Sequence, residues 1–131
     1  MKYYKGYKYQ VAEDTWLQSS IYGKRVSHRF FELYEDGRLL IRAGYAWDGV
    51  TGFFDLDCLM SPSAGHDVLF QCQRNGWLTH DEAFHQSNAD LRRWARERGC
   101  WEWLANRVFG AVEKFGTAHA ALQPDKIYEA P

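Results

Sequence analysis

Three residues with side chains suited to acid–base chemistry, His66, Asp67 and Asp90, fall on two consecutive predicted helices. At about 100° per residue, Asp90 lies on the apolar stripe of the second of these helices. That stripe consists of Ala83, Ser87, Leu91, Trp94 and Ala95. Because an unpaired carboxylate is costly to bury, Asp90 needs a partner, and His66 is the nearest good candidate.

The two helices should bring His66 and Asp90 together. Helices joined by a short loop usually pack antiparallel, and His66 lies about 11 positions before Trp77 whereas Asp90 lies 13 after it. A carboxylate that accepts a hydrogen bond from one ring nitrogen of a histidine leaves the other nitrogen free to act as a base. We therefore expect the pair either to activate water or to form a buried structural hydrogen bond. His85 falls on the far side of the second helix, near Asn88, and is discounted.

Asp67 and Asp48 could bind a calcium ion. The segment 44–54 (GYAWDGVTGFF) contains three glycines and should form an ordered loop whose backbone can approach a ligand closely. Calcium takes carboxylate and carbonyl oxygens in irregular geometry, which suits Asp67, the loop carbonyls and Asp48. Simpler roles stay open: Asp67 could be a first-turn acid at the positive end of its helix, and Asp48 a turn residue before Gly49.

The order of the elements predicts an α+β fold in which amino-terminal antiparallel β-hairpins precede three α-helices packed as an antiparallel unit. The length of 131 residues predicts a single domain, 1–131. Within it, 1–60 should be mainly strands and loops, 61–116 helical, and 117–131 a tail.

The clearest local signal is a tight hairpin, in which 29–35 and 38–42 flank the Asp36-Gly37 pair. Thr79 and Glu82 have the spacing of a capping box at the start of the second helix. Short strands are expected over 8–11 and 15–22, and helices over 61–74, 79–98 and 101–115. The inner face of the third helix should consist of Trp101, Leu104, Ala105, Val108, Phe109, Val112 and Phe115.

The composition argues against several classes of partner. With 16 basic and 17 acidic residues, the formal net charge is -1, which favours neither nucleic acid nor an anionic membrane. No stretch approaches the ~18 continuous apolar residues of a transmembrane segment, and residues 1–10 do not resemble a secretory signal. Cys58, Cys72 and Cys100 lack the spacing of a disulfide framework or a zinc site, so we expect reduced core thiols in a cytoplasmic protein, located in the host cell or inside a virion.

Over residues 30–116, the chain resembles the phage and prophage family catalogued as domain of unknown function 1353. The resemblance rests on the hairpin at Asp36-Gly37 followed, in order, by AGYAWDGVTG, AGHDVLF, NADLRRW and AVEKFG. The family commonly has Ser and Pro after the aspartate that corresponds to Asp48, where this chain has VTG at 50–52. The resemblance implies a phage or prophage origin without an assigned activity.

The glycine-containing loop, the His-Asp pair on one helix and the Asp on its partner helix are also similar to the catalytic layout of phospholipase A2. This similarity implies that His66 activates water, that Asp90 orients His66, and that Asp67 and loop carbonyls hold calcium. The disulfides that support the secreted enzymes are not expected in this chain.

Two hypotheses about function follow. The first is a small phage hydrolase that acts on a lipid or another small molecule, with His66 and Asp90 as its catalytic pair and calcium at Asp67. The second is a non-enzymatic accessory, virion or assembly protein that binds a host or phage protein and uses His66 and Asp90 as a buried structural pair. Its binding face would contain the amino-terminal tyrosines Tyr3, Tyr4, Tyr7 and Tyr9.

Overall fold

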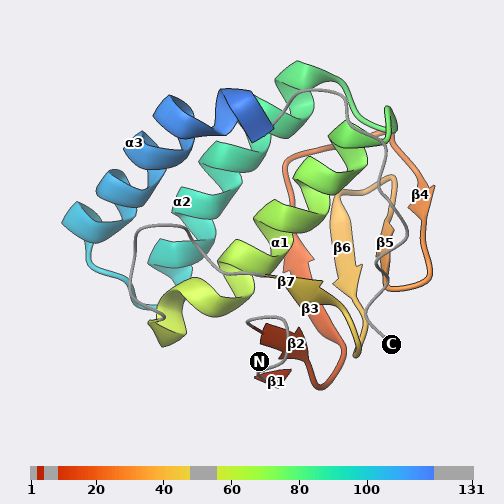
Figure 1. The fold of residues 1–131 in the computed structure, drawn as a ribbon, viewed down its shortest axis with the longest axis horizontal. Coiled ribbons are helices and arrows are strands. Elements are labelled where there is room, and N and C mark those ends of the chain that lie inside the picture. Colours follow the sequence, from red (N-terminus) through yellow and green to blue (C-terminus); the bar gives the residue numbers. More distant parts are fainter. Residues whose placement is uncertain (1–2, 5–8, 48–55, 120–131) are drawn as a thin grey trace.

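The computed structural model describes residues 3–4, 9–47 and 56–119 (Figure 1). Antiparallel strands come first and helices second, which confirms the predicted α+β fold. Asp48 and most of the glycine-containing loop lie outside the described residues, and so do residues 120–131 of the predicted tail, whereas 117–119 belong to the third helix.

The strands form two antiparallel sheets. The order of the first sheet is β1-β2-β7, and its strands are β1 (Tyr3–Tyr4), β2 (Tyr9–Val11) and β7 (Ala46–Trp47). The order of the second sheet is β3-β6-β5-β4, and its strands are β3 (Thr15–Gln18), β6 (Arg38–Ile41), β5 (Phe31–Leu33) and β4 (Val26–Ser27). Side chains alternate between the two faces of a strand, so Leu17 and Leu39 are buried against the helices, whereas Trp16 is 48% exposed on the opposite face.

The predicted hairpin at Asp36-Gly37 is confirmed and connects β5 to β6. The amide of Tyr34 donates to the carbonyl of Arg38 (2.9 Å), and the amide of Gly37 donates to the carbonyl of Tyr34 (2.9 Å). Gly37 has a φ of 85°, and a Cβ atom there would lie 2.6 Å from the carbonyl oxygen of Ser19. Both the conformation and the lack of space therefore require glycine at this position.

The helical half contains α1 (Asp57–Arg74), a π-helical turn η1 (Glu82–Gln86), α2 (Ser87–Glu97) and α3 (Glu102–His119). The second predicted helix is thus divided into η1 and α2. The capping box at its start is confirmed, because the Thr79 amide donates to Glu82 Oε1 (2.9 Å) and the Glu82 amide donates to Thr79 Oγ1 (3.2 Å).

The start of α1 differs from the prediction. The helix begins at Asp57 rather than at Ser61, so that Pro62 lies inside it. Leu59 and Met60 are buried in this extra turn, and their burial offsets the backbone hydrogen bond that proline cannot donate.

The inner face of α3 is confirmed at Leu104, Ala105 and Val108, which are buried, but the prediction is wrong at Trp101, which is 69% exposed. Trp101 precedes the first helical residue, so the helical period does not fix its direction. Its ring lies against that of Trp103, with 6.0 Å between the ring centroids.

The helices lie side by side next to the four-stranded sheet, with α1 between the sheet and α2, and with α3 on the other side of α2 (Figure 1). Gly65 of α1 lets side chains of β3 and α2 come close to the backbone of α1. A Cβ atom there would lie 2.5 Å from Leu17 Cδ1 and 2.9 Å from Trp94 Cζ3. None of the helices described combines the length and the apolar character that crossing a bilayer requires.

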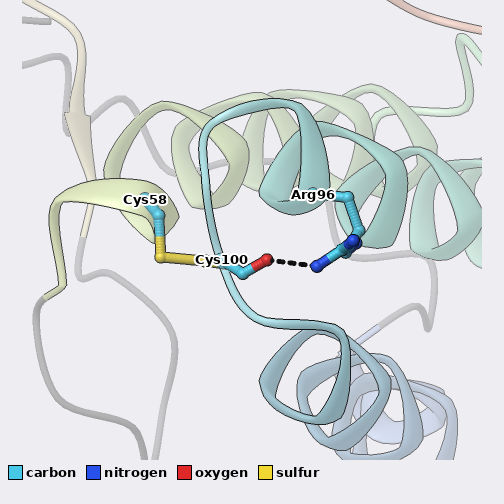
Figure 2. Close-up of a disulfide and its surroundings, with 3 residues drawn as sticks. All are labelled: Cys58, Arg96 and Cys100. Atoms are coloured by element: carbon cyan, nitrogen blue, oxygen red, sulfur yellow. Dashed lines mark hydrogen bonds between the residues drawn. A yellow bond between two sulfur atoms is a disulfide. The ribbon is translucent and has the colours of Figure 1, made fainter.

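The prediction of three reduced thiols is wrong. Cys58 and Cys100 form a disulfide, with 5.4 Å between their Cα atoms, whereas Cys72 is not part of a disulfide and is buried in the core. Figure 2 shows the bridge between the first turn of α1 and the connection from α2 to α3, where Arg96 Nη1 also donates to the Cys100 carbonyl (2.8 Å). The two cysteines are 42 positions apart, and only tertiary packing brings them together.

Replacing both Cys58 and Cys100 by serine should lower the free energy of unfolding by about 4 kcal/mol, because the bridge restricts a loop of this length in the unfolded chain. Urea denaturation measures the change. Dithiothreitol should destabilise the wild type by a similar amount and leave the double variant unchanged. Thiol titration of the unreduced, denatured wild type should detect Cys72 alone, and detection of all three cysteines would contradict the bridge.

Candidate functional site

His66 lies in the interior between α1 and α2, with 8% of its surface exposed. Its Nε2 atom is 2.6 Å from Oδ1 of Asn88, and its ring lies against Phe70, with 4.3 Å between the ring centroids. The predicted partner was Asp90. The histidine is therefore oriented by an amide of α2 rather than by a carboxylate.

Burial lowers the pKa of His66 to about 4, because the imidazolium ion loses its hydration, and the hydrogen bond to Asn88 opposes this shift only in part. The ring is therefore neutral at neutral pH. A neutral ring with its proton on Nε2 donates to the amide oxygen of Asn88. A histidine with this pKa is a weak proton acceptor compared with a catalytic base whose pKa is close to 7.

Asp90 is buried, as its place on the apolar stripe predicted, with 2% of its surface exposed. Its Oδ2 accepts hydrogen bonds from the amide (2.9 Å) and the hydroxyl (3.2 Å) of Ser20, and its Oδ1 accepts one from Arg93 Nη2 (3.0 Å). Burial raises the pKa of Asp90, while the Ser20 amide and the Arg93 charge act against that rise. Among the described residues, the hydrogen-bond partners of Asp90 are thus Ser20 and Arg93, and the expected bond to His66 does not form.

The geometry of α2 explains why the predicted pair does not form. Asn88 and Asp90 are two positions apart, and at about 100° per residue their side chains leave the helix in nearly opposite directions. Asn88 faces α1, and Asp90 faces the end of β3. There, the carbonyl of Gln18 also accepts hydrogen bonds from Arg93 Nη2 and from Trp94 Nε1 (2.8 Å).

Sequence reasoning placed Asn88 on the outer side of its helix, whereas the structure buries it completely. Asn88 lies seven positions before Ala95, so at about 100° per residue the regular period of α2 already places the two side chains only about 20° apart, at the edge of the buried stripe. Asn88 Nδ2 and Ser87 Oγ are buried and have no hydrogen-bond partner among the described residues. The angular position of Asn88 beside Ala95 was the signal that could have identified it as buried.

The calcium prediction stays a prediction. Asp67 is half-buried on α1, and Asp48 lies outside the described residues. In the ranges that the structure describes, no three His, Cys, Asp or Glu side chains are placed to share a metal ion. His85 is on the surface, as expected, with 60% of its side chain exposed.

No family model, curated protein or solved structure matched the chain. The resemblance to the phage family and the similarity to phospholipase A2 therefore stay predictions from the sequence.

Acid should destabilise the fold through His66. Its pKa is about 4 in the folded protein, against the ordinary value of 6.5 that applies to the unfolded chain. The unfolded chain therefore binds the proton more tightly, and stability is lost as the pH falls from about 6.5 towards 4. This difference corresponds to about 3 kcal/mol. His66→Gln can still donate to Asn88 but cannot titrate, so it should lose about 3 kcal/mol less than the wild type between pH 7 and pH 4.

Urea denaturation at the two pH values measures this difference. His80→Gln is the matched control, because it removes a histidine whose side chain is 51% exposed. An equal loss of stability in the wild type and in His66→Gln would contradict the buried, neutral ring.

Asp90→Ala should lower the free energy of unfolding by about 3 kcal/mol, because the Ser20 amide and Arg93 lose their buried acceptor. Asp90→Asn keeps one acceptor oxygen for Ser20 and should cost about half as much. The control is Glu97→Ala on the same helix, where a carboxylate that is 56% exposed lies 3.8 Å from Arg93 and should contribute less than about 0.5 kcal/mol. Thermal unfolding measures all three variants, and equal effects of Asp90→Ala and Glu97→Ala would disprove the anchoring role.

Proposed function

We propose that the chain is a non-enzymatic accessory or assembly protein of a phage particle and that it binds another protein. In this proposal, His66 and Asp90 are structural groups that hold α2 against α1 and against the end of β3. The observation that carries it is the separate bonding of the two residues: His66 is bonded to Asn88, and Asp90 to Ser20 and Arg93.

The state of His66 supports a structural role. A general base needs a ring nitrogen that substrate or water can reach and a pKa near the working pH. His66 is buried, and its ring packs against Phe70. Its low pKa keeps it neutral, which suits a hydrogen-bond donor between two helices.

The surface supports a binding role. Large aromatic side chains are exposed on several elements, and aromatic residues are the ones that most often dominate protein–protein interfaces. These side chains are Trp16, Tyr22, Trp77, Trp101 and Trp103. Tyr9 is buried with 2% exposure, so it does not belong to the predicted tyrosine face, and the side chains of the other three tyrosines of that face lie outside the described residues.

The Cys58–Cys100 disulfide favours a location in the phage particle over one in the host cytoplasm. Disulfides persist on virions and in extracellular proteins and are rare in the reducing cytoplasm. A cytoplasmic location was expected because all three cysteines were predicted to be reduced. The Cys58–Cys100 bridge removes that reason. We place the working form of the protein in an assembled or released particle.

A hydrolase is the second candidate, and the bond between His66 and Asn88 favours it. An asparagine can orient a catalytic histidine in place of a carboxylate, as in cysteine proteases of the papain type. In this version, Asn88 replaces Asp90 as the orienting group, calcium is held by Asp67 and Asp48, and the substrate is an ester or a lipid.

The two candidates are separated by one set of measurements on the wild type and His66→Gln. We expect hydrolysis of p-nitrophenyl butyrate and of phosphatidylcholine vesicles at the buffer rate in both proteins, with and without calcium. We also expect the wild type and His66→Gln, each used as bait in a lysate of the bacterium whose genome encodes the chain, to capture the same protein in a stoichiometric amount. Calcium-dependent hydrolysis that His66→Gln abolishes without unfolding would overturn the binding proposal in favour of the hydrolase.

A further inference from the structure

The outer face of the four-stranded sheet contains a shallow hollow of about 270 Å³, lined by Trp16, Leu17, Gln18 and Arg38. These residues belong to the paired strands β3 and β6, in which Gln18 lies opposite Arg38. Trp16 and Gln18 are two positions apart and share the face that points away from the helices. The hollow is therefore separate from the interior that contains His66.

Aromatic rings hold the guanidinium group of Arg38 at the edge of this hollow. Its Cζ atom lies 5.5 Å from the ring centroid of Trp16 and 5.1 Å from that of Tyr34. The two rings are stacked on each other, with 5.8 Å between centroids and 27° between planes. Cation–π contacts of this kind restrict a long side chain that would otherwise be mobile on the surface.

The carboxylate of Asp36 fixes the orientation of the Arg38 guanidinium group. Arg38 Nε donates to Asp36 Oδ2 (2.7 Å), while the Arg38 amide donates to Asp36 Oδ1 (3.1 Å). These bonds and the Arg38 charge lower the pKa of Asp36, so that it stays ionised. The Nε edge of the guanidinium is thus occupied, and the edge formed by Nη1 and Nη2 points elsewhere.

The Nη1 and Nη2 atoms of Arg38 and the Nε1 atom of Trp16 have no acceptor in the part of the chain that the structure describes. Neighbouring guanidinium groups differ, because Arg25 and Arg42 both donate to Glu32, at 3.2 Å and 2.8 Å. Arg38 therefore presents an unused pair of N–H donors beside an exposed indole. Such a fork matches the two oxygens of a carboxylate.

We propose that this hollow binds an acidic side chain of a protein partner, with Arg38 as the ion-pairing residue and Trp16 as the surface against which the partner's neighbouring apolar residue packs. The inference rests on the proposed function and names the binding surface and the chemistry of the partner. A singly charged carboxylate fits better than a phosphate, because Asp36 already offsets part of the Arg38 charge and would repel a dianion.

The test is a titration of the full-length, ¹⁵N-labelled protein with the peptide acetyl-Ala-Glu-Leu-Glu-Ala-amide, followed through the indole N–H signal of Trp16. The same peptide with Gln in place of Glu, and inorganic phosphate, are the comparison probes. We expect saturable shifts of the Trp16 signal with the Glu peptide and about tenfold weaker binding of the Gln peptide, since a charge-assisted fork is lost. Equal binding of the Gln peptide, tighter binding of phosphate, or no shift at Trp16 would overturn the proposal.

Substitutions at Arg38 test whether this residue forms the ion pair with the peptide. Arg38→Gln should weaken binding of the Glu peptide about tenfold, and Arg38→Lys should restore only part of it, because lysine keeps the charge but not the fork. Arg107→Gln, an exposed position on α3, is the matched control and should bind as the wild type does. Unchanged peptide binding by Arg38→Gln would disprove the site.

The two proposals can fail separately. If Arg38→Gln still captures the partner protein, this site is refuted and the proposed binding function is left intact. Binding of the Glu peptide without any captured partner would support the site and count against the proposed function.

Discussion

The carboxylate of Asp90 fixes the relation between the helical layer and the sheet. α2 packs along α1 through buried apolar side chains such as Leu91 and Trp94, and α1 lies between α2 and most of the sheet. The bonds from Ser20 to Asp90, and from Arg93 and Trp94 to the Gln18 carbonyl, attach α2 directly to the end of β3. That attachment places Asn88 opposite His66. Desolvation cancels much of the Coulombic gain of such a buried charge, so that its hydrogen bonds to Ser20 and Arg93 are what keep its burial from being costly.

The features predicted correctly from the sequence are those that depend on a few neighbouring residues. Asp36-Gly37 specifies a hairpin because the turn needs a residue with positive φ, and the structure has Gly37 there at 85°. Thr79 and Glu82 form their capping box because both hydrogen bonds are local. The burial of Asp90 followed from helical periodicity within a single regular helix. The α+β class followed from the order of such elements.

The features that were missed depend on contacts distant in the sequence. One partner of Asp90 is Ser20, which is 70 positions away, and the pairing of Cys58 with Cys100 likewise depends on how α1 packs against α2. No spacing rule identifies such partners. α1 begins earlier than predicted because the tertiary burial of Leu59 and Met60 outweighs the preference of proline for the first turn of a helix. Asn88 was missed because it lies at the edge of the buried stripe, about 20° beyond Ala95, and was grouped with His85 rather than with the buried residues.

The Cys58–Cys100 bridge makes the interval between these residues a covalently closed ring that contains almost all of α1, the turn η1 and α2. A pulling force applied to the two ends of the chain therefore passes through the sulfur atoms and does not extend this interval. A protease cut in the exposed connection after Trp77 leaves the two fragments joined. The helices around His66 and Asn88 thus lie in a segment that neither an end-to-end pull nor a single cut separates while the bridge is intact.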